Sequence, residues 1–119
     1  MVRFLLFPRM EVFPVDGAIY YMDDIDPDLL DLLPGYLARR RQDVALAQAA
    51  ASTGDFRTIE IIGHRLKGNA AQFGFVKLET VGRELEQAAL AKDVPRINNA
   101  MRDLALEVDE LSARLGAGN

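Results

Sequence analysis

The chain of 119 residues contains no cysteine and only one histidine. Without thiols it cannot form a disulfide, use a thiolate nucleophile or build a cysteine-rich zinc site, and this composition agrees with a reducing compartment. A single histidine also argues against most other zinc sites. The longest apolar run near the N-terminus, Phe4-Leu5-Leu6-Phe7, is far too short for a signal-peptide core or a membrane span. We therefore expect a soluble, cytoplasmic protein with no metal, no cofactor of its own and no membrane segment.

The chain also has less positive than negative charge. Its 14 Lys and Arg residues are outnumbered by 18 Asp and Glu residues, which gives a net charge of −4. An acidic protein binds a phosphate backbone poorly, so we do not expect a nucleic-acid partner. The length suits one domain with a hydrophobic core that needs no disulfide or metal.

Most of the chain has the apolar period of amphipathic helices. A first helix is expected to start at Asp26-Pro27 and to break or bend at Pro34-Gly35, after which its stripe continues to residues 52–54. Asp55 is a predicted cap for a second helix that ends near Gly74. A third helix is expected over 76–91, with four residues facing inward: Leu78, Val81, Leu85 and Ala88.

The last helix has the clearest stripe, with spacings of three and four. Its apolar members are Val94, Ile97, Met101, Leu104, Val108, Leu111 and Leu115, and charged residues including Glu107 are assigned to its other faces. Such a heptad also suits a dimeric coiled coil, but three companion helices in the same chain favour packing within a monomer. Short turns between helices imply antiparallel neighbours.

We therefore predict an all-α fold: an antiparallel up-and-down four-helix bundle with a short additional N-terminal helix and an extended N-terminal arm. The expected boundaries are an arm over 1–23, the bundle over 24–116 and a disordered tail over 117–119. Residues 1–23 mix aromatic residues, valine, proline and glycine without a helical period.

The single histidine, His64, is predicted to face solvent. At about 100° per residue, the apolar stripe of its helix lies roughly 120° to 220° away from the imidazole. Lys67, Gly68 and Ala71 fall on the same side as His64. Gly63 and Gly68 each cost the helix roughly 0.8 to 1 kcal/mol relative to alanine, and close approach by a partner is a natural compensation.

An exposed neutral imidazole can act as a nucleophile toward phosphorus. Lys67, one turn away, supplies a cation for phosphoryl oxygens, and Gly68 leaves room for an incoming surface. From Ile61 through Leu78 the sequence has no Asp or Glu, whereas Arg65, Lys67 and Lys77 are positive. This local basic patch on an acidic protein predicts a partner with an acidic pocket.

The run His64-Arg65-Leu66-Lys67-Gly68, with Gly74 six positions later, resembles the H-x-x-K-G-x-x-x-x-x-G signature of histidine-containing phosphotransfer (HPt) domains. The resemblance extends over about residues 24 to 115. It includes Asp26-Pro27-Asp28-Leu29, residues 33–37, the run Arg39-Arg40-Arg41-Gln42-Asp43, Gly54-Asp55-Phe56, Gly74-Phe75 and residues 85–89.

The resemblance implies a phosphorelay intermediate of a two-component system, which carries phosphate without kinase activity of its own. His64 would accept the phosphoryl group from a receiver phospho-aspartate, or from a kinase, and pass it to a response-regulator aspartate. The implied partners are receiver domains, which bring Mg²⁺, and a hybrid sensor histidine kinase. The implied roles are phosphoacceptor for His64, phosphoryl stabilisation for Lys67 and partner clearance for Gly68.

Further contacts with the partner or the imidazole are expected from six residues: Arg65, Ala71, Gln72, Phe75, Glu86 and Gln87. Of these, either Glu86 or Gln87 is the expected neighbour of His64. For Phe75, inward packing in a turn is an equal alternative. Two other functions are weighed against the carrier. One is a helical docking module that binds a receiver or histidine kinase as inhibitor or adaptor without accepting phosphate, and the other is an adaptor outside phosphorelay.

Overall fold

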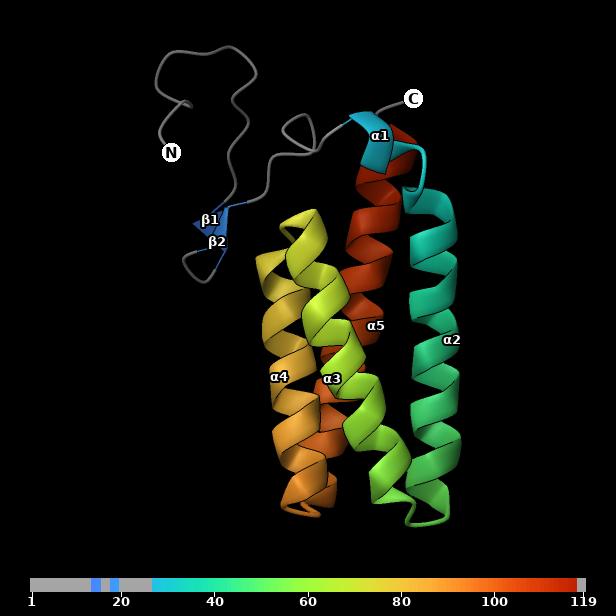
Figure 1. The fold of residues 1–119 in the computed structure, drawn as a ribbon, viewed down its shortest axis with the longest axis vertical. Helices are drawn as coiled ribbons and strands as arrows, with labels where there is room; N and C mark the ends of the chain where they lie inside the picture. The colour runs from blue at the N-terminus through green and yellow to red at the C-terminus, as the bar shows by residue number, and fades with distance from the viewer. Residues whose placement is uncertain (1–13, 16–17, 20–26, 118–119) are drawn as a thin grey trace.

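Four antiparallel helices form the body of the molecule in the computed structural model (Figure 1). The structure describes residues 14–15, 18–19 and 27–117; the rest of the predicted arm, the predicted start of the bundle at residue 24 and residues 118–119 of the predicted tail lie outside these ranges. The elements are β1 (Pro14–Val15), β2 (Ala18–Ile19), α1 (Pro27–Leu30), α2 (Leu33–Ser52), α3 (Phe56–Phe73), α4 (Val76–Leu90) and α5 (Val94–Ala117).

The helices follow one another around the bundle in chain order. α3 packs on α2 and α4, and α5 packs on α4 and α2, so the predicted all-α up-and-down bundle is confirmed. The short helix α1 precedes α2, as predicted. β1 and β2 pair antiparallel with Pro14 opposite Ile19 and Val15 opposite Ala18, and β2 lies beside α4.

The break between the first two helices lies earlier than predicted. α2 begins at Leu33 and contains Pro34 and Gly35 in its first turn, so these residues do not interrupt it. Proline is tolerated there because the first N–H groups of a helix have no partner within the helix. The chain instead turns at Asp31 and Leu32, where the Leu32 N–H donates to the Leu29 carbonyl at 2.9 Å.

Both predicted ends of α3 are confirmed. The side chain of Asp55 accepts a hydrogen bond from the Thr58 N–H at 3.2 Å, which caps the first turn. Gly74 ends the helix with φ of 77°, a left-handed conformation that glycine adopts without penalty, and the Phe75 N–H returns to the Ala70 carbonyl at 3.0 Å. The Asp55 cap and the Gly74 stop therefore define the two ends of the helix from which His64 points into solvent.

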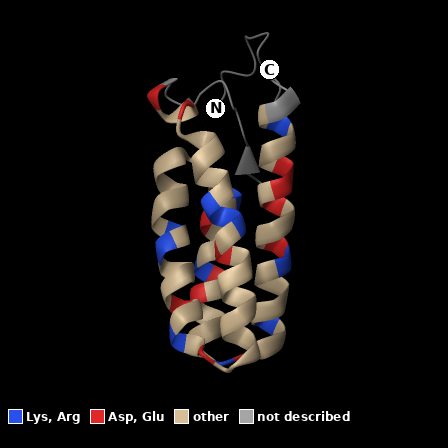
Figure 2. Cartoon of the chain, turned by 90° about the vertical axis from the view of Figure 1, so that its right-hand side faces the viewer, with Lys and Arg blue, Asp and Glu red and all other residues tan. Residues whose placement is uncertain are grey.

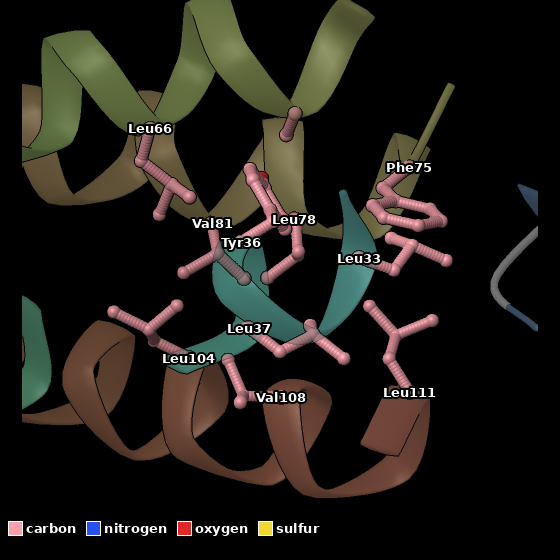
Figure 3. Close-up of a cluster of buried hydrophobic side chains, with 11 residues drawn as sticks. Leu33, Tyr36, Leu37, Leu66, Phe75, Leu78, Val81, Leu104, Val108 and Leu111 are labelled. Atoms are coloured by element: carbon pink, nitrogen blue, oxygen red, sulfur yellow. The ribbon is translucent and has the colours of Figure 1, made fainter. Parts of the chain in front are cut away.

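The core fills the length of the bundle in two adjoining clusters of apolar side chains. One contains Leu33, Leu66, Leu78, Leu104 and Leu111 among its members (Figure 3). The second lies toward the α2–α3 turn and includes Ile59, Ile62, Leu85, Ala88 and Ile97. The four residues of α4 that were predicted to face inward are all buried.

The predicted stripe of α5 is wrong at two positions. Val94 is 44% exposed, because it is the first residue of the helix and lies at the edge of the bundle. Glu107 is only 6% exposed instead of solvated, since it lies on the flank of α5 that meets α4, where its carboxylate is 3.9 Å from Lys77 Nζ. None of the helices in the described part of the chain combines the length and apolar composition that a membrane span requires.

Candidate functional site

His64 projects from the middle of α3 into solvent. Its side chain is 69% exposed, whereas Ile62 and Leu66, on the other side of the helix, are buried in the core. The helical period therefore predicted the direction of the imidazole correctly, and both ends of α3 are held by the caps described above.

One carboxylate from α4 contacts both polar residues of the predicted site. Oε2 of Glu86 lies 3.0 Å from Nδ1 of His64, and Oε1 of Glu86 accepts a hydrogen bond from Lys67 Nζ at 2.9 Å. The Glu86 side chain is 16% exposed and that of Lys67 is 33% exposed, so this pair is more protected from water than the imidazole. Of the two candidates for the neighbour of His64, the structure selects Glu86.

The ionisation of Glu86 determines which nitrogen of His64 carries a proton. The hydrogen bond from Lys67 lowers the pKa of Glu86 below its usual value. Partial burial acts in the opposite direction, and the hydrogen bond with His64 lowers this pKa by a smaller amount. An ionised carboxylate can only accept hydrogen bonds, so Nδ1 of His64 must be the donor. In the neutral ring, Nε2 then has the free lone pair.

Two glycines bring α4 close enough for this contact. A Cβ on Gly63 would lie 2.5 Å from the Glu86 backbone nitrogen, and a Cβ on Gly82 would lie 2.5 Å from the Lys67 backbone nitrogen. A real Cβ does not approach a backbone atom so closely. The two helices, which run side by side in Figure 1, therefore touch backbone to backbone at Gly63, next to His64.

The remaining surface around His64 is largely open. No heavy atom lies within 4 Å of the position that a Cβ on Gly68 would occupy, except for the neighbouring backbone of the helix itself. Arg65, Ala71 and Gln72, which were predicted to meet a partner, are exposed on α3, and Gln87 is exposed on α4. Acidic and basic residues are interspersed along the helices visible in Figure 2.

Phe75 does not have the exposed position that a partner contact requires. It is 2% exposed, belongs to the core and stacks on Phe73 with ring centroids 5.4 Å apart. Because α3 stops at Gly74, the chain turns and Phe75 faces inward, as in the alternative interpretation. We therefore remove Phe75 from the predicted partner surface.

The sequence interpretation missed Gly82 and the double contact of Glu86. The sequence has no acidic residue from Ile61 through Leu78, but α4 runs antiparallel to α3 and brings the carboxylate of Glu86 to the imidazole. A glycine four residues before Glu86 in an amphipathic helix was the available signal, because it marks a surface that another backbone can approach. In the described ranges no three His, Asp or Glu side chains are grouped to hold a metal ion.

Comparison with known proteins agrees with this geometry. A family model described as the Hpt domain matches residues 25–114, a range that contains α1 to α4, most of α5 and every residue of the site. No curated protein and no solved structure matches the chain significantly. Hpt domains are phosphocarriers rather than catalysts, and they interact with receiver domains and kinases. Since the match covers far more than half of its length, the chain belongs to the Hpt domain family, and this membership implies histidine phosphotransfer in phosphorelay signalling.

Proposed function

We propose that His64 accepts a phosphoryl group on Nε2 from the phospho-aspartate of a receiver domain and passes it to the aspartate of a second receiver. The observation that carries this proposal is the contact between Glu86 and Nδ1 of an imidazole that is otherwise open to solvent. That contact leaves the outer nitrogen free as the nucleophile.

The transfer step exchanges one bond to phosphorus for another. The lone pair on Nε2 attacks phosphorus, an N–P bond forms, and the P–O bond to the receiver aspartate breaks so that its carboxylate leaves. His64 keeps its proton on Nδ1, so the ring becomes a cation. Glu86 stabilises that cation from the edge of the ring opposite the incoming phosphoryl group. The reverse step delivers the group to the next receiver and restores the neutral imidazole.

Lys67 compensates the negative charge that the phosphoryl group brings. An ammonium group has three protons, so Lys67 can donate to Glu86 and to a phosphoryl oxygen at the same time. The positive charge of the lysine, next to the carboxylate, also offsets the repulsion between Glu86 and the phosphoryl group. With Lys67 beside it, Glu86 supports the reaction although it carries a negative charge near the site of the negatively charged phosphoryl group.

Partner access depends on the surface beside His64. The open space over Gly68 lets a receiver bring its aspartate in line with Nε2, and the exposed residues Arg65, Ala71 and Gln72 extend the contact along α3. Gln87 extends it onto α4. The receiver brings the Mg²⁺, and the donor is a receiver or a hybrid sensor histidine kinase. We propose that the chain acts as a cytoplasmic monomer without kinase activity.

Transfer of labelled phosphate from a panel of phosphorylated receiver domains tests this function. Wild-type protein should acquire acid-labile label from a cognate receiver within seconds to minutes. His64→Gln should acquire none, although it should still bind that receiver, because the substitution removes the nucleophile and leaves the surface in place. Binding of a receiver without label on the folded wild-type protein would instead favour the docking module. Label on His64→Gln would refute His64 as the acceptor.

A further inference from the structure

The crossing of α3 and α4 is built around Gly82, a residue one turn before Glu86. A Cβ at Gly82 would lie 2.5 Å from the backbone nitrogen of Lys67 and 3.0 Å from both its Cα and the Gly63 carbonyl oxygen. All three atoms belong to the backbone of α3, which cannot rotate away as the end of a flexible side chain could. Any side chain at residue 82 must therefore displace one helix from the other.

Gly63 makes the matching contact from the other helix. Its Cβ would lie 2.8 Å from the Gly82 carbonyl oxygen and 3.0 Å from Cα of Glu86. Each glycine thus packs against the other helix, and besides each other's carbonyl oxygens the backbone atoms they meet belong to Lys67 and Glu86. These are the residues whose side chains are joined at 2.9 Å.

We infer that Gly82 is a positioning residue for phosphotransfer, because the close helix crossing it permits sets the reach of Glu86 to His64 and Lys67. The inference rests on the proposed function of His64 and adds to it the residue that positions the Glu86 carboxylate. Gly82 touches neither the imidazole nor the phosphoryl group and acts through the backbone.

The distances explain why a small displacement matters. Both hydrogen bonds of Glu86 are close to the ordinary length, at 2.9 and 3.0 Å. Moving a Cβ from 2.5 Å to an ordinary contact of 3.4 Å or more requires a shift of several tenths of an ångström or more. Hydrogen bonds weaken steeply beyond their usual range, and one carboxylate cannot keep both partners if its helix moves away from both.

The first test is Gly82→Ala, examined by ¹H–¹⁵N NMR of the imidazole. Because the chain has one histidine, its ring signals are unambiguous. In the wild type, the neutral ring should be held with its proton on Nδ1. In Gly82→Ala, the proton should be shared between the two nitrogens, and transfer from a saturating receiver should slow several-fold, up to about 10-fold. Receiver affinity should stay within about twofold, since Gly82 is buried under α3.

Gly68→Ala is the matched control for the imidazole. It makes the same chemical change, with the same gain in helix propensity, in the same pair of helices, but a Cβ there meets no other atom within 4 Å. It should leave the proton of His64 on Nδ1. A double-mutant cycle with Glu86→Ala completes the test, because Gly82→Ala should slow transfer little further once the carboxylate is gone.

The outcomes separate this inference from the proposed function. Unchanged ring signals and transfer in Gly82→Ala, with a wild type that is phosphorylated, would overturn the inference and leave the function intact. A shifted proton in Gly82→Ala, with a wild type that no receiver phosphorylates, would support the positioning role and refute the function.

Loss of folding is also informative. If Gly82→Ala does not fold, it is repeated with Lys92→Gly, which relieves a left-handed backbone with φ of 54° in the turn before α5. A double variant that folds is examined in the same way. One that still does not fold would overturn the inference, because Gly82 would then serve stability rather than the position of Glu86.

Discussion

The two opposite sides of the bundle are joined in different ways. Between α3 and α4 the backbones touch through Gly63 and Gly82, and a partly buried carboxylate bridges His64 and Lys67. Between α2 and α5 there is an open groove of about 630 Å³, lined by Gln48, Ala51, Ser52, Val94, Asn98, Met101, Arg102 and Ala105. Further along the same side, Arg41 contacts Asp109 at 2.6 Å and Ser112 at 2.8 Å.

The difference shows what close backbone contact contributes to a site. Glu86 has short polar contacts because its backbone is pressed against α3, and its side chain is 16% exposed. Arg41 and Asp109 are joined at the even shorter distance of 2.6 Å, but their side chains are 51% and 65% exposed. Water and salt screen such an exposed pair, and long side chains lose entropy in forming it. We therefore expect electrostatic effects on function only from the α3–α4 side.

The largest effect within this comparison is expected from Lys67→Ala. The variant loses the cation that compensates the phosphoryl group and leaves Glu86 without its strongest hydrogen-bond donor. Transfer to His64 should fall by about 10²-fold, as when one charge-stabilising donor is removed from an enzyme. Arg102→Ala, in the groove of the opposite side, is the control and should transfer at the wild-type rate in a stopped-flow or gel assay. Equal rates for the two variants would contradict the contrast between the sides.

An intermediate effect is expected from Glu86→Gln, which should slow transfer by about 10-fold because the ring loses the anionic partner that holds its proton on Nδ1. Glu86→Gln should also change how the free energy of unfolding depends on pH. The native pKa of Glu86 lies below the ordinary value of 4.5, so the ionised carboxylate stabilises the fold above about pH 4.5. This contribution is lost as the pH falls through the lowered native pKa.

Urea unfolding between pH 6 and pH 3 measures this contribution. The difference in stability between wild type and Glu86→Gln should shrink as the pH decreases through this window. Glu84→Gln is the control: its pKa is also lowered, chiefly by a hydrogen bond from Arg96, so it should show a similar change with pH but a wild-type rate of transfer. A difference for Glu86→Gln that grows toward low pH would show that the sign is wrong.

The smallest effect is expected from Arg41→Ala. The exposed ion pair with Asp109 should contribute less than about 1 kcal/mol to the free energy of unfolding, and less at high salt. Transfer to His64 should not change, since Arg41 faces α5. Chemical denaturation at low and high salt measures the first quantity, and the labelled-phosphate assay measures the second. A loss of several kcal/mol would mean that the α2–α5 side is more tightly coupled than its exposure indicates.

The sequence was sufficient to predict the bundle because its signals are local. Asp55 as a cap and Gly74 as a stop predicted both ends of α3, and the helical period predicted the exposure of His64. The break at Pro34 was placed wrongly because proline suits both the first turn of a helix and its interruption. The burial of Phe75 also depended on a turn, whose direction the apolar period alone does not give.

The missed part of the site depends on contacts between distant parts of the chain. Glu86 lies 22 residues after His64, and its position depends on how far apart α3 and α4 pack. That separation is set by Gly82, whose closest contacts are with the backbone of Lys67. A helical period shows which face of α4 is buried, but not how closely another helix approaches it.

The most direct test of the account is to identify the phosphorylated nitrogen of His64 by ¹H–¹⁵N and ³¹P NMR after loading by a cognate receiver. The contact between Glu86 and Nδ1 predicts phosphorus on Nε2, with the proton retained on Nδ1. Phosphorus on Nδ1 would contradict the account, because Glu86 would then have to give up the imidazole before transfer could begin.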